Sequence, residues 1–348
     1  MLISVVIPVH GVAEHLGACL DSVLGQPGAC VEVIAVDDAS PDGCGAILDG
    51  RARRDPRLRV VHLGASAGPG QARRTGAGAA TGEYVWFVDG DDMLADGALA
   101  GVSQRLERLR PDVLVIGYED AYPPDGSGHR GRPHLPPGPP SRGAGPDEPQ
   151  VFTLAERPGL IRMTMTSWSK VLRRAFLCEL GVPFGPGIHE DVPVSCAALL
   201  AARRISVLDQ VCYRYRRERH GSFMATVSAR HFDIFASYEW VFRFLDGQEG
   251  PGPAGLRPAG DAVRAAVFER AIWHYTTLLG LVPRGDRREF FRRMSRDFRR
   301  YRPEGYTPPA GARGVKFRLV ERDAYRAYTA LEPLNGLRVA LRASLGAP

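Results

Sequence analysis

Three carboxylates follow an apolar run within four residues. The run is Val85-Trp86-Phe87-Val88, and it leads into Asp89-Gly90-Asp91-Asp92. Apolar, β-prone residues bounded by glycine are typical of a buried strand, so these acids stand at a strand end and repel one another unless a cation neutralises them. Carboxylate oxygens suit Mg²⁺ or Mn²⁺, which also bind phosphate. The pattern indicates a metal site; an acidic loop that caps the next helix is the alternative.

Acids also end an earlier apolar run. Residues 31–36 lead into Asp37-Asp38, which is followed by the turn-forming residues 39–43. A carboxylate at this place, Asp38 above all, can accept hydrogen bonds from a nucleobase or from ribose hydroxyls. A turn with a helix cap is the alternative interpretation.

A glycine-rich stretch opens a predicted helix. Its sequence is Gly68-Pro69-Gly70-Gln71-Ala72-Arg73-Arg74. Such a helix start offers unpaired N–H groups and the positive end of the helix dipole to a phosphate, and Arg73 or Arg74 would add a charge-assisted contact. The alternative is an ordinary helix start, rich in glycine and proline, that is followed by surface arginines.

The first 120 residues alternate between strand-like and helix-like patterns. We predict strands at 3–9, 31–36, 59–63, 84–88 and 113–118, with helices at 12–24, 45–53, 70–80 and 95–108. This alternation predicts an α/β fold whose mostly parallel sheet carries helices on both faces. Ligands of such sheets bind at the carboxyl ends of the strands. Three strands end there in Pro8-Val9-His10, Asp37-Asp38 and Asp89 to Asp92, as one nucleotide site requires.

The second part of the chain differs in composition. Residues 121–150 are half proline and glycine, which predicts an extended insertion. A strand is expected at 205–211, and helices at 227–245, 261–281, 287–301 and 320–345. We therefore divide the chain into an α/β domain, residues 1–225, and a C-terminal helical region, residues 226–348.

Charge is unevenly distributed. The net charge is +6, yet residues 1–120 carry −7 and residues 121–348 carry +13. A basic second part suggests an anionic partner such as nucleotide phosphates, a polyanionic acceptor or anionic lipid, with no nucleic acid expected. Residues 287–301 combine an aromatic face with seven arginines, which fits either a membrane surface or a helix packed on the core. A solvated arginine-rich surface is the alternative.

The composition indicates which class of protein this is. Of the 348 residues, 44% are hydrophobic and 24% charged, as in globular proteins. No apolar run reaches the ~18 residues of a membrane span, and the start of the chain has the pattern of a strand rather than a signal peptide. The six cysteines form no C-x-x-C pair, so free thiols in a reducing compartment are expected. These features predict a cytoplasmic protein, with peripheral contact to the inner membrane face as a further expectation.

Taken in order, the motifs resemble the donor half of family 2 glycosyltransferases. The matching segments are residues 4–10, 36–43, 68–73 and 87–92, and the resemblance continues through Trp168-Ser169-Lys170, His189-Glu190-Asp191, residues 213–216 and His220-Gly221-Ser222. His10-Gly11 stands where the family usually has Tyr-Asn. The resemblance covers residues 1–225 and implies a GT-A fold and an inverting reaction.

The resemblance also implies roles for particular residues. Asp191 matches the catalytic base, and Glu190 would orient it or bind the acceptor. Residues expected to hold the donor are Pro8, His10, Asp38, Arg73 and Asp91. Arg214, Arg216 and Ser222 lie, with His220, where a flexible segment could close on the diphosphate, because arginine and serine donate to oxyanions and a neutral histidine could complete the metal site. A solvated basic loop is the alternative. Residues implied in holding Mn²⁺ or Mg²⁺ are Asp89, Asp91, Asp92 and His220.

Inverting transfer needs one base for the acceptor hydroxyl and one Lewis acid for the departing diphosphate. At the start of a predicted helix, Asp191 is expected to keep a low pKa and to be ionised; a plain acidic helix cap is the alternative. We therefore predict a metal-dependent inverting glycosyltransferase. Its donor is a nucleotide sugar, uridine-based by preference. Its acceptor is a hydroxyl of a cell-envelope glycan, a teichoic-acid-like polymer or a lipid-linked glycan.

Two other functions compete with this prediction. A catalytically inactive basic scaffold would bind polymer or membrane, but intact Asp92 and Asp191 argue against it. A sugar-1-phosphate nucleotidyltransferase would carry a glycine-rich loop with arginine and lysine directly after the first strand. That position holds His10-Gly11-Val12-Ala13-Glu14 instead.

Overall fold

The structure is a computed structural model. It describes residues 1–122, 134, 151–163, 165–182, 184–185, 187–217, 226–249 and 260–331. The predicted insertion thus lies outside the described residues, apart from its first two residues and His134, which forms a bridge with Tyr118.

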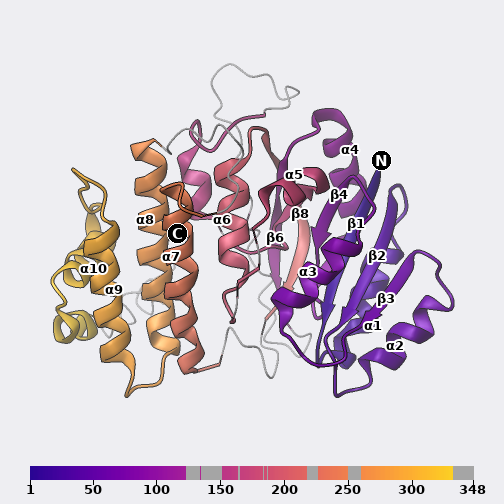
Figure 1. The fold of residues 1–348 in the computed structure, drawn as a ribbon, viewed down its shortest axis with the longest axis horizontal. Coiled ribbons are helices and arrows are strands. Elements are labelled where there is room, and N and C mark those ends of the chain that lie inside the picture. The colour runs from indigo at the N-terminus through magenta and orange to yellow at the C-terminus, as the bar shows by residue number, and fades with distance from the viewer. Residues whose placement is uncertain are drawn as a thin grey trace, which may run out of the picture.

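Eight strands form one sheet within the described ranges (Figure 1). Their order across the sheet is β3-β2-β1-β4-β7-β6-β8-β5. The strands are β1 Leu2–Val9, β2 Cys30–Asp37, β3 Leu58–His62, β4 Tyr84–Phe87, β5 Met93–Leu94, β6 Val113–Ala121, β7 Lys170–Arg173 and β8 Ile205–Arg216.

Helices cover both faces of this sheet. Those of the first part are α1 Ala13–Leu24, α2 Cys44–Ala52, α3 Pro69–Ala79, α4 Ala98–Leu109, α5 Arg174–Leu180 and α6 Asp191–Ala201. The C-terminal helices are α7 Asp233–Leu245, α8 Asp261–Leu278, α9 Arg287–Tyr301 and α10 Gly311–Glu321. Short 3-10 turns lie at Pro158–Arg162, Ala229–Phe232 and Leu279–Leu281. The predicted α/β fold followed by helices is confirmed.

The sheet is mixed in direction. β3, β2, β1 and β4 run parallel, as the alternating pattern predicts, and β6 is parallel to β8. β7, which the sequence patterns missed because it has four residues, runs antiparallel between β4 and β6. Antiparallel pairing with β4 brings the start of β7 to the carboxyl end of β4. The segment before β7 therefore reaches the edge where the candidate residues gather.

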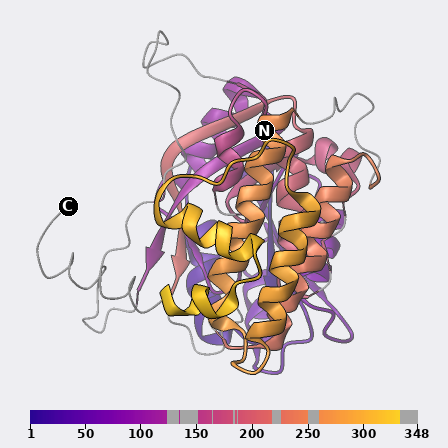
Figure 2. The ribbon, with the colours of Figure 1, turned by 90° about the vertical axis from the view of Figure 1, so that its left-hand side faces the viewer.

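Alternating side chains of the central strands fill two separate cores. On β1, Val5 and Ile7 face the core under α1, α2 and α4, whereas Val6 faces the other one. Val85 and Phe87 of β4 join that second core, as the period of two in a strand requires. The second core continues through α6 into α7, α8 and α9. These helices stand beside the sheet in Figure 1, and the C-terminal ones lie in front of it in Figure 2. The C-terminal helices are thus packed onto the α/β part, and the proposed boundary at residue 225 lies in the undescribed segment 218–225.

Helix α9 buries its aromatic face. Phe290, Phe291, Met294 and Phe298 are fully buried, and several of the surrounding arginines pair with acids, for example Arg288 with Asp323 and Arg300 with Glu239. The packing interpretation of residues 287–301 is the one that the structure adopts. Contact of the exposed arginines with an anionic membrane stays a prediction.

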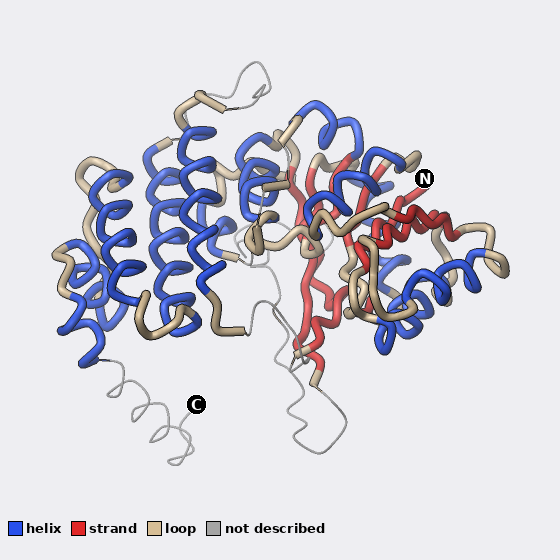
Figure 3. The backbone as a smooth tube through the Cα atoms, turned by 60° about the horizontal axis from the view of Figure 1, so that its bottom comes forward, coloured by secondary structure: helices blue, strands red, loops and turns tan. Residues whose placement is uncertain are grey.

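The last predicted helix, 320–345, begins differently in the structure, and its residues 332–345 lie outside the described residues. Helix α10 ends at Glu321, and Asp323 turns the chain with φ of +52° before a second helical stretch at 325–331 (Figure 3). The carboxylate of Asp323 accepts two hydrogen bonds from Arg288 of α9. This contact between Arg288 and Asp323 holds the break between the two helical stretches, which the periodicity of the sequence does not indicate. Within the described residues no helix has both the length and the apolar character needed to cross a bilayer.

Phe298→Ala should lower the free energy of unfolding by about 3–5 kcal/mol, because it leaves a cavity in a closed core. The Phe298 ring lies 4.9 Å from that of Phe268 on α8 and 6.3 Å from that of Phe317 on α10. Arg296→Gln on the exposed side of α9 is the matched control and should change stability by less than about 0.5 kcal/mol. Denaturant unfolding measures both; equal small effects would contradict the buried placement of this face.

Candidate functional site

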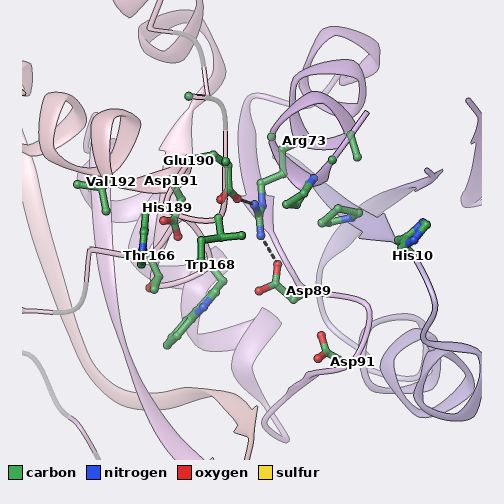
Figure 4. Close-up of a pocket in the computed structure, with 18 of the residues that line it drawn as sticks. His10, Arg73, Asp89, Asp91, Thr166, Trp168, His189, Glu190, Asp191 and Val192 are labelled. Atoms are coloured by element: carbon green, nitrogen blue, oxygen red, sulfur yellow. Dashed lines mark hydrogen bonds and ion pairs between the residues drawn. The ribbon is translucent and has the colours of Figure 1, made fainter. Parts of the chain in front are cut away.

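A cavity of about 790 Å³ opens where the carboxyl ends of β1, β2 and β4 face the start of α6 (Figure 4). Helix α8 contributes to its far wall. Residues from many separate segments line it, among them Pro8, His10, Asp38, Arg73, Asp89, Asp91, Thr166, Trp168, Glu190, Asp191, Arg270 and His274. The three strand ends that the sequence singles out therefore meet in one place, together with the predicted Glu190-Asp191 pair.

Arg73 joins the two sides of this cavity. Its side chain is buried, and one guanidinium nitrogen, Nη2, donates to Asp89 Oδ1 at 2.6 Å. The other, Nη1, donates to Glu190 Oε1. Burial alone disfavours the cation, but Asp89 and Glu190 raise the pKa of Arg73 above its ordinary value. These two carboxylate contacts fix the strand end after β4 against the start of α6, and the predicted phosphate contact of Arg73 stays a prediction.

Gly70 makes room for this contact. A Cβ at Gly70 would lie 2.9 Å from Glu190 Cγ, and 3.1 Å from both the Gly185 carbonyl oxygen and Phe184 Cβ. Helix α3 can therefore approach α6 closely only with glycine at this position, one turn before Arg73.

Asp191 begins α6 and accepts a hydrogen bond from the Ser167 N–H at 3.2 Å. Burial, and then the neighbouring Glu190 charge, raise the pKa of Asp191 to about 7, against the opposing effect of Arg73. The expected low pKa is therefore wrong: desolvation and a like charge outweigh the helix end. A carboxylate with this pKa can take up and release a proton near neutral pH.

The acids of the turn from Asp89 to Asp92 lie in two different environments. Asp89 and Asp91 line the cavity. Asp92 is buried away from it, where it accepts from the Tyr213 hydroxyl at 2.6 Å and from the Arg216 N–H at 2.7 Å. Burial, with the nearby Asp91 and Asp89 charges, raises the pKa of Asp92 well above its ordinary value. Asp92 therefore anchors the turn to β8, Asp91 is the acid of this pair that faces the cavity, and the predicted set of metal ligands stays a prediction.

The remaining acids suit a hard cation that also binds phosphate. Among the described residues no group of three or more His, Cys, Asp or Glu side chains is placed to hold a metal ion. Mg²⁺ in phosphate sites, however, is usually held by one or two carboxylates plus substrate oxygens. Asp91 and the cavity-facing Asp89 meet that requirement. His220 and Ser222, the other predicted contacts here, lie outside the described residues.

Arg214 and Arg216 do not line the cavity. The sequence placed them on a flexible segment, but they belong to β8, where Arg214 Nε donates to Glu119 at 3.0 Å and Arg216 Nε donates to the Asp91 carbonyl at 2.8 Å. Tyr215 and Arg217 line the cavity instead. The Tyr-Arg-Tyr-Arg alternation is itself a strand signal that could have separated these two faces.

Asp38 shapes the other end of the cavity. Its carboxylate accepts from the N–H groups of Ala67 at 2.7 Å and Gly68 at 2.9 Å, and from the Ser66 hydroxyl at 2.9 Å. His10 Nδ1 donates to the Asp38 carbonyl at 2.8 Å and exposes its ring at the rim. Asp38 therefore holds the loop that leads into α3, and its predicted contact with a nucleobase stays a prediction.

Sequence patterns missed part of the wall. Arg270 and His274 come from α8, and His189 lies next to His274 at 5.6 Å between ring centroids. Burial and the adjacent His231 lower the pKa of His189 to about 3, so this ring is neutral. Helix α8 begins about forty residues after the last motif and gives no local signal that it completes the cavity, whereas Trp168 could have been found through its motif.

Gly70→Ala should destabilise the protein by about 1–3 kcal/mol, because the added methyl group overpacks the contact with Glu190. Gly78→Ala in the same helix has no neighbour within 4 Å of its Cβ. This control should instead stabilise by about 0.4–1 kcal/mol, since alanine restricts the unfolded chain. Thermal or denaturant unfolding distinguishes the two. Stabilisation by both changes would show that α3 and α6 are not in such close contact.

The chain is similar in sequence to several known proteins. A family model described as "Glycosyl transferase family 2" matches residues 4–168. The chain is 33% identical over 258 residues to the succinoglycan biosynthesis protein ExoO of Rhizobium meliloti, covering 69% of this chain and 67% of ExoO. It is 30% identical over 217 residues to the uncharacterized glycosyltransferase EpsJ of Bacillus subtilis, covering 62% and 61%.

A solved structure shows a similar fold. The crystal structure of residues 1–349 of Staphylococcus aureus TarS in complex with UDP-GlcNAc superimposes with a TM-score of 0.72 at 21% identity, covering 96% of this chain and 91% of that one. Whole TarS is named a poly(ribitol-phosphate) beta-N-acetylglucosaminyltransferase; the match is 30% identical and spans 68% of this chain but 39% of TarS. The expected GT-A fold is confirmed, and the chain belongs to glycosyltransferase family 2.

Proposed function

We propose that this protein is a metal-dependent, inverting glycosyltransferase that moves a sugar from a nucleotide-sugar donor to an acceptor hydroxyl. The observation that carries this proposal is the single cavity with Asp89 and Asp91 on one side, Asp191 on the other and Arg73 between them. The donor we favour is a UDP-sugar, in keeping with the UDP-GlcNAc bound by TarS. The acceptor class we favour is a cell-envelope glycan, a teichoic-acid-like polymer or a lipid-linked glycan, in keeping with the names of TarS and ExoO.

Asp191 acts as the base. Its carboxylate takes the proton of the acceptor hydroxyl while that oxygen bonds to the anomeric carbon and the bond to the nucleoside diphosphate breaks. One base opposite the leaving group inverts the configuration at that carbon. A pKa near 7 leaves a useful fraction of the carboxylate ionised at neutral pH and strong enough as a base. Glu190 stays paired with Arg73 and so limits the movement of Asp191, its neighbour in the chain.

Asp91, with Asp89, would hold Mn²⁺ or Mg²⁺ on the donor side. When bound, such an ion neutralises the charge of a departing diphosphate. The start of α3 lies at the same cavity and offers the positive end of its dipole to phosphate. Pro8, His10 and Asp38 line the end where we place the nucleobase and ribose.

We further propose a cytoplasmic reaction with peripheral contact to an anionic membrane. Exposed arginines of α9, among them Arg292, Arg296 and Arg299, supply a basic rim, and each basic residue near such a surface contributes about 1 kcal/mol. Arg292 shares its charge with Glu289 at 2.9 Å, which weakens its contribution to membrane attachment.

Asp191→Asn keeps the shape of the side chain but removes its ability to accept a proton. Turnover should fall by roughly 10²–10⁴-fold with donor affinity nearly unchanged. In the wild type, transfer should decline below about pH 7, by about tenfold for each further pH unit, because the protonated carboxyl is inactive. Rates at varied pH with a UDP-sugar and a hydroxyl acceptor measure both effects. A variant that transfers sugar at the wild-type rate would remove Asp191 from the mechanism.

Asp91→Asn should weaken the Mn²⁺-dependent binding of UDP by at least about tenfold, because a carboxylate ligand is lost. Asp92→Asn is the matched control. The raised pKa of Asp92 favours its neutral form, which asparagine imitates while still accepting from the Arg216 N–H. Its affinity should stay close to that of the wild type in calorimetric titrations with UDP, with and without Mn²⁺. The opposite ranking of the two variants would restore Asp92 as the ligand.

A further inference from the structure

Lys170 is a buried cation behind the proposed base. It begins β7 in the middle of the sheet and is 2% exposed. Its Nζ donates to the Thr166 carbonyl at 3.0 Å and contacts Ser169 Oγ at 3.1 Å. Ser169 Oγ also donates to the Thr166 carbonyl at 3.0 Å. The ammonium therefore closes a tight turn over residues 166–170, in a motif to which the proposed reaction gives no role.

One peptide group connects this turn with Asp191. The C=O of the Thr166–Ser167 peptide accepts from Lys170, and the N–H of the same peptide donates to Asp191 Oδ2 at 3.2 Å. In a trans peptide these two groups point in opposite directions. The peptide thus lies between the ammonium of Lys170 on its inner side and the carboxylate of Asp191 on the cavity side. Figure 4 shows Thr166 and Trp168 next to Asp191.

This arrangement couples the two charges. A cation at a carbonyl oxygen polarises the peptide and strengthens its N–H as a donor, and a stronger donor to a carboxylate favours the ionised form. The charges also attract each other directly through the interior, where screening by water is weak. Both effects act in the same direction.

We propose that Lys170 is a positioning residue for the base: through the Thr166–Ser167 peptide group it holds Asp191 in place and favours its ionised form. The inference rests on the proposed function, because it takes Asp191 as the base.

Several other groups set the charge around Asp191. Glu190 and Asp89 oppose its ionisation, and Arg73 favours it. Around Lys170 the further titratable or charged neighbours are Cys196 of α6 and Arg270 of α8. Tyr238 of α7 also senses the Asp191 charge, and the nearby His189 is neutral. Replacing Arg73 would also break its contacts with Asp89 and Glu190, and with them the contact between α3 and α6. Replacing Lys170 should change the titration of Asp191 and leave that contact in place.

Kinetics against pH test this role. Lys170→Met removes the charge and the donor, and Lys170→Gln removes the charge but keeps a donor. In both variants, the decline of kcat at acid pH should begin about one pH unit higher than in the wild type. At a pH below that decline, kcat should therefore be about tenfold lower. The KM for the donor should change little. Lys316→Met is the matched control, because Lys316 is the only other lysine of the sequence and lies on α10. An unshifted acid limb in a folded Lys170 variant would overturn the proposal.

A second measurement needs no activity. With only two lysines, ¹³Cε-lysine labelling should give two resonances, which Lys316→Met assigns. Burial lowers the pKa of Lys170 to about 8, against the opposing effect of the Asp191 charge. Asp191→Asn should therefore lower the titration midpoint of Lys170 further. An unchanged midpoint would overturn the coupling.

The two assays separate the failure of this inference from that of the function. If Asp191→Asn transfers sugar at the wild-type rate, the proposed base is wrong. If Asp191→Asn is inactive while the Lys170 variants keep the wild-type acid limb, the function stands and the role of Lys170 is wrong.

Discussion

A buried arginine between two carboxylates is the contact on which the site depends. Arg73 on α3 binds Asp89, at the end of β4, and Glu190, at the start of α6. Asp89, Asp91, Glu190 and Asp191 all line one cavity, and such a concentration of negative charge is costly without a counter-ion. Because Arg73 compensates part of this charge, several acids can line the same cavity.

The fold brings these residues together from distant parts of the chain. Parallel strands deliver His10, Asp38 and Asp89 to one edge, and the antiparallel β7 carries the turn at residues 166–169 to the same edge from the opposite direction. Helix α6 then presents its first turn to that edge, while α8 closes the far side. A core shared by the sheet and the C-terminal helices keeps this wall in place. The helical region is therefore a structural part of the site.

Strand and helix patterns predicted the first half of the fold because local periodicity and burial agree there. Asp89, Asp91 and Asp191 could be found from the sequence because each follows or opens an element whose end faces the cavity. Asp92 could not be separated from Asp91, since only the tertiary contact with Tyr213 buries it. The pKa of Asp191 could not be predicted either, because it depends on desolvation and on charges brought in by folding. The same holds for Arg73, whose partners lie 16 and 117 residues away in the chain.

The most direct test of the account is a crystal structure of the protein with an unreactive UDP-sugar and Mn²⁺. The account predicts the diphosphate and the metal ion beside Asp91, with the Arg73 contacts to Asp89 and Glu190 intact. The anomeric carbon should face Asp191 across the cavity, with space for an acceptor hydroxyl between them. A donor bound with its anomeric carbon turned away from Asp191, or a metal ion held by Asp92 instead of Asp91, would contradict it.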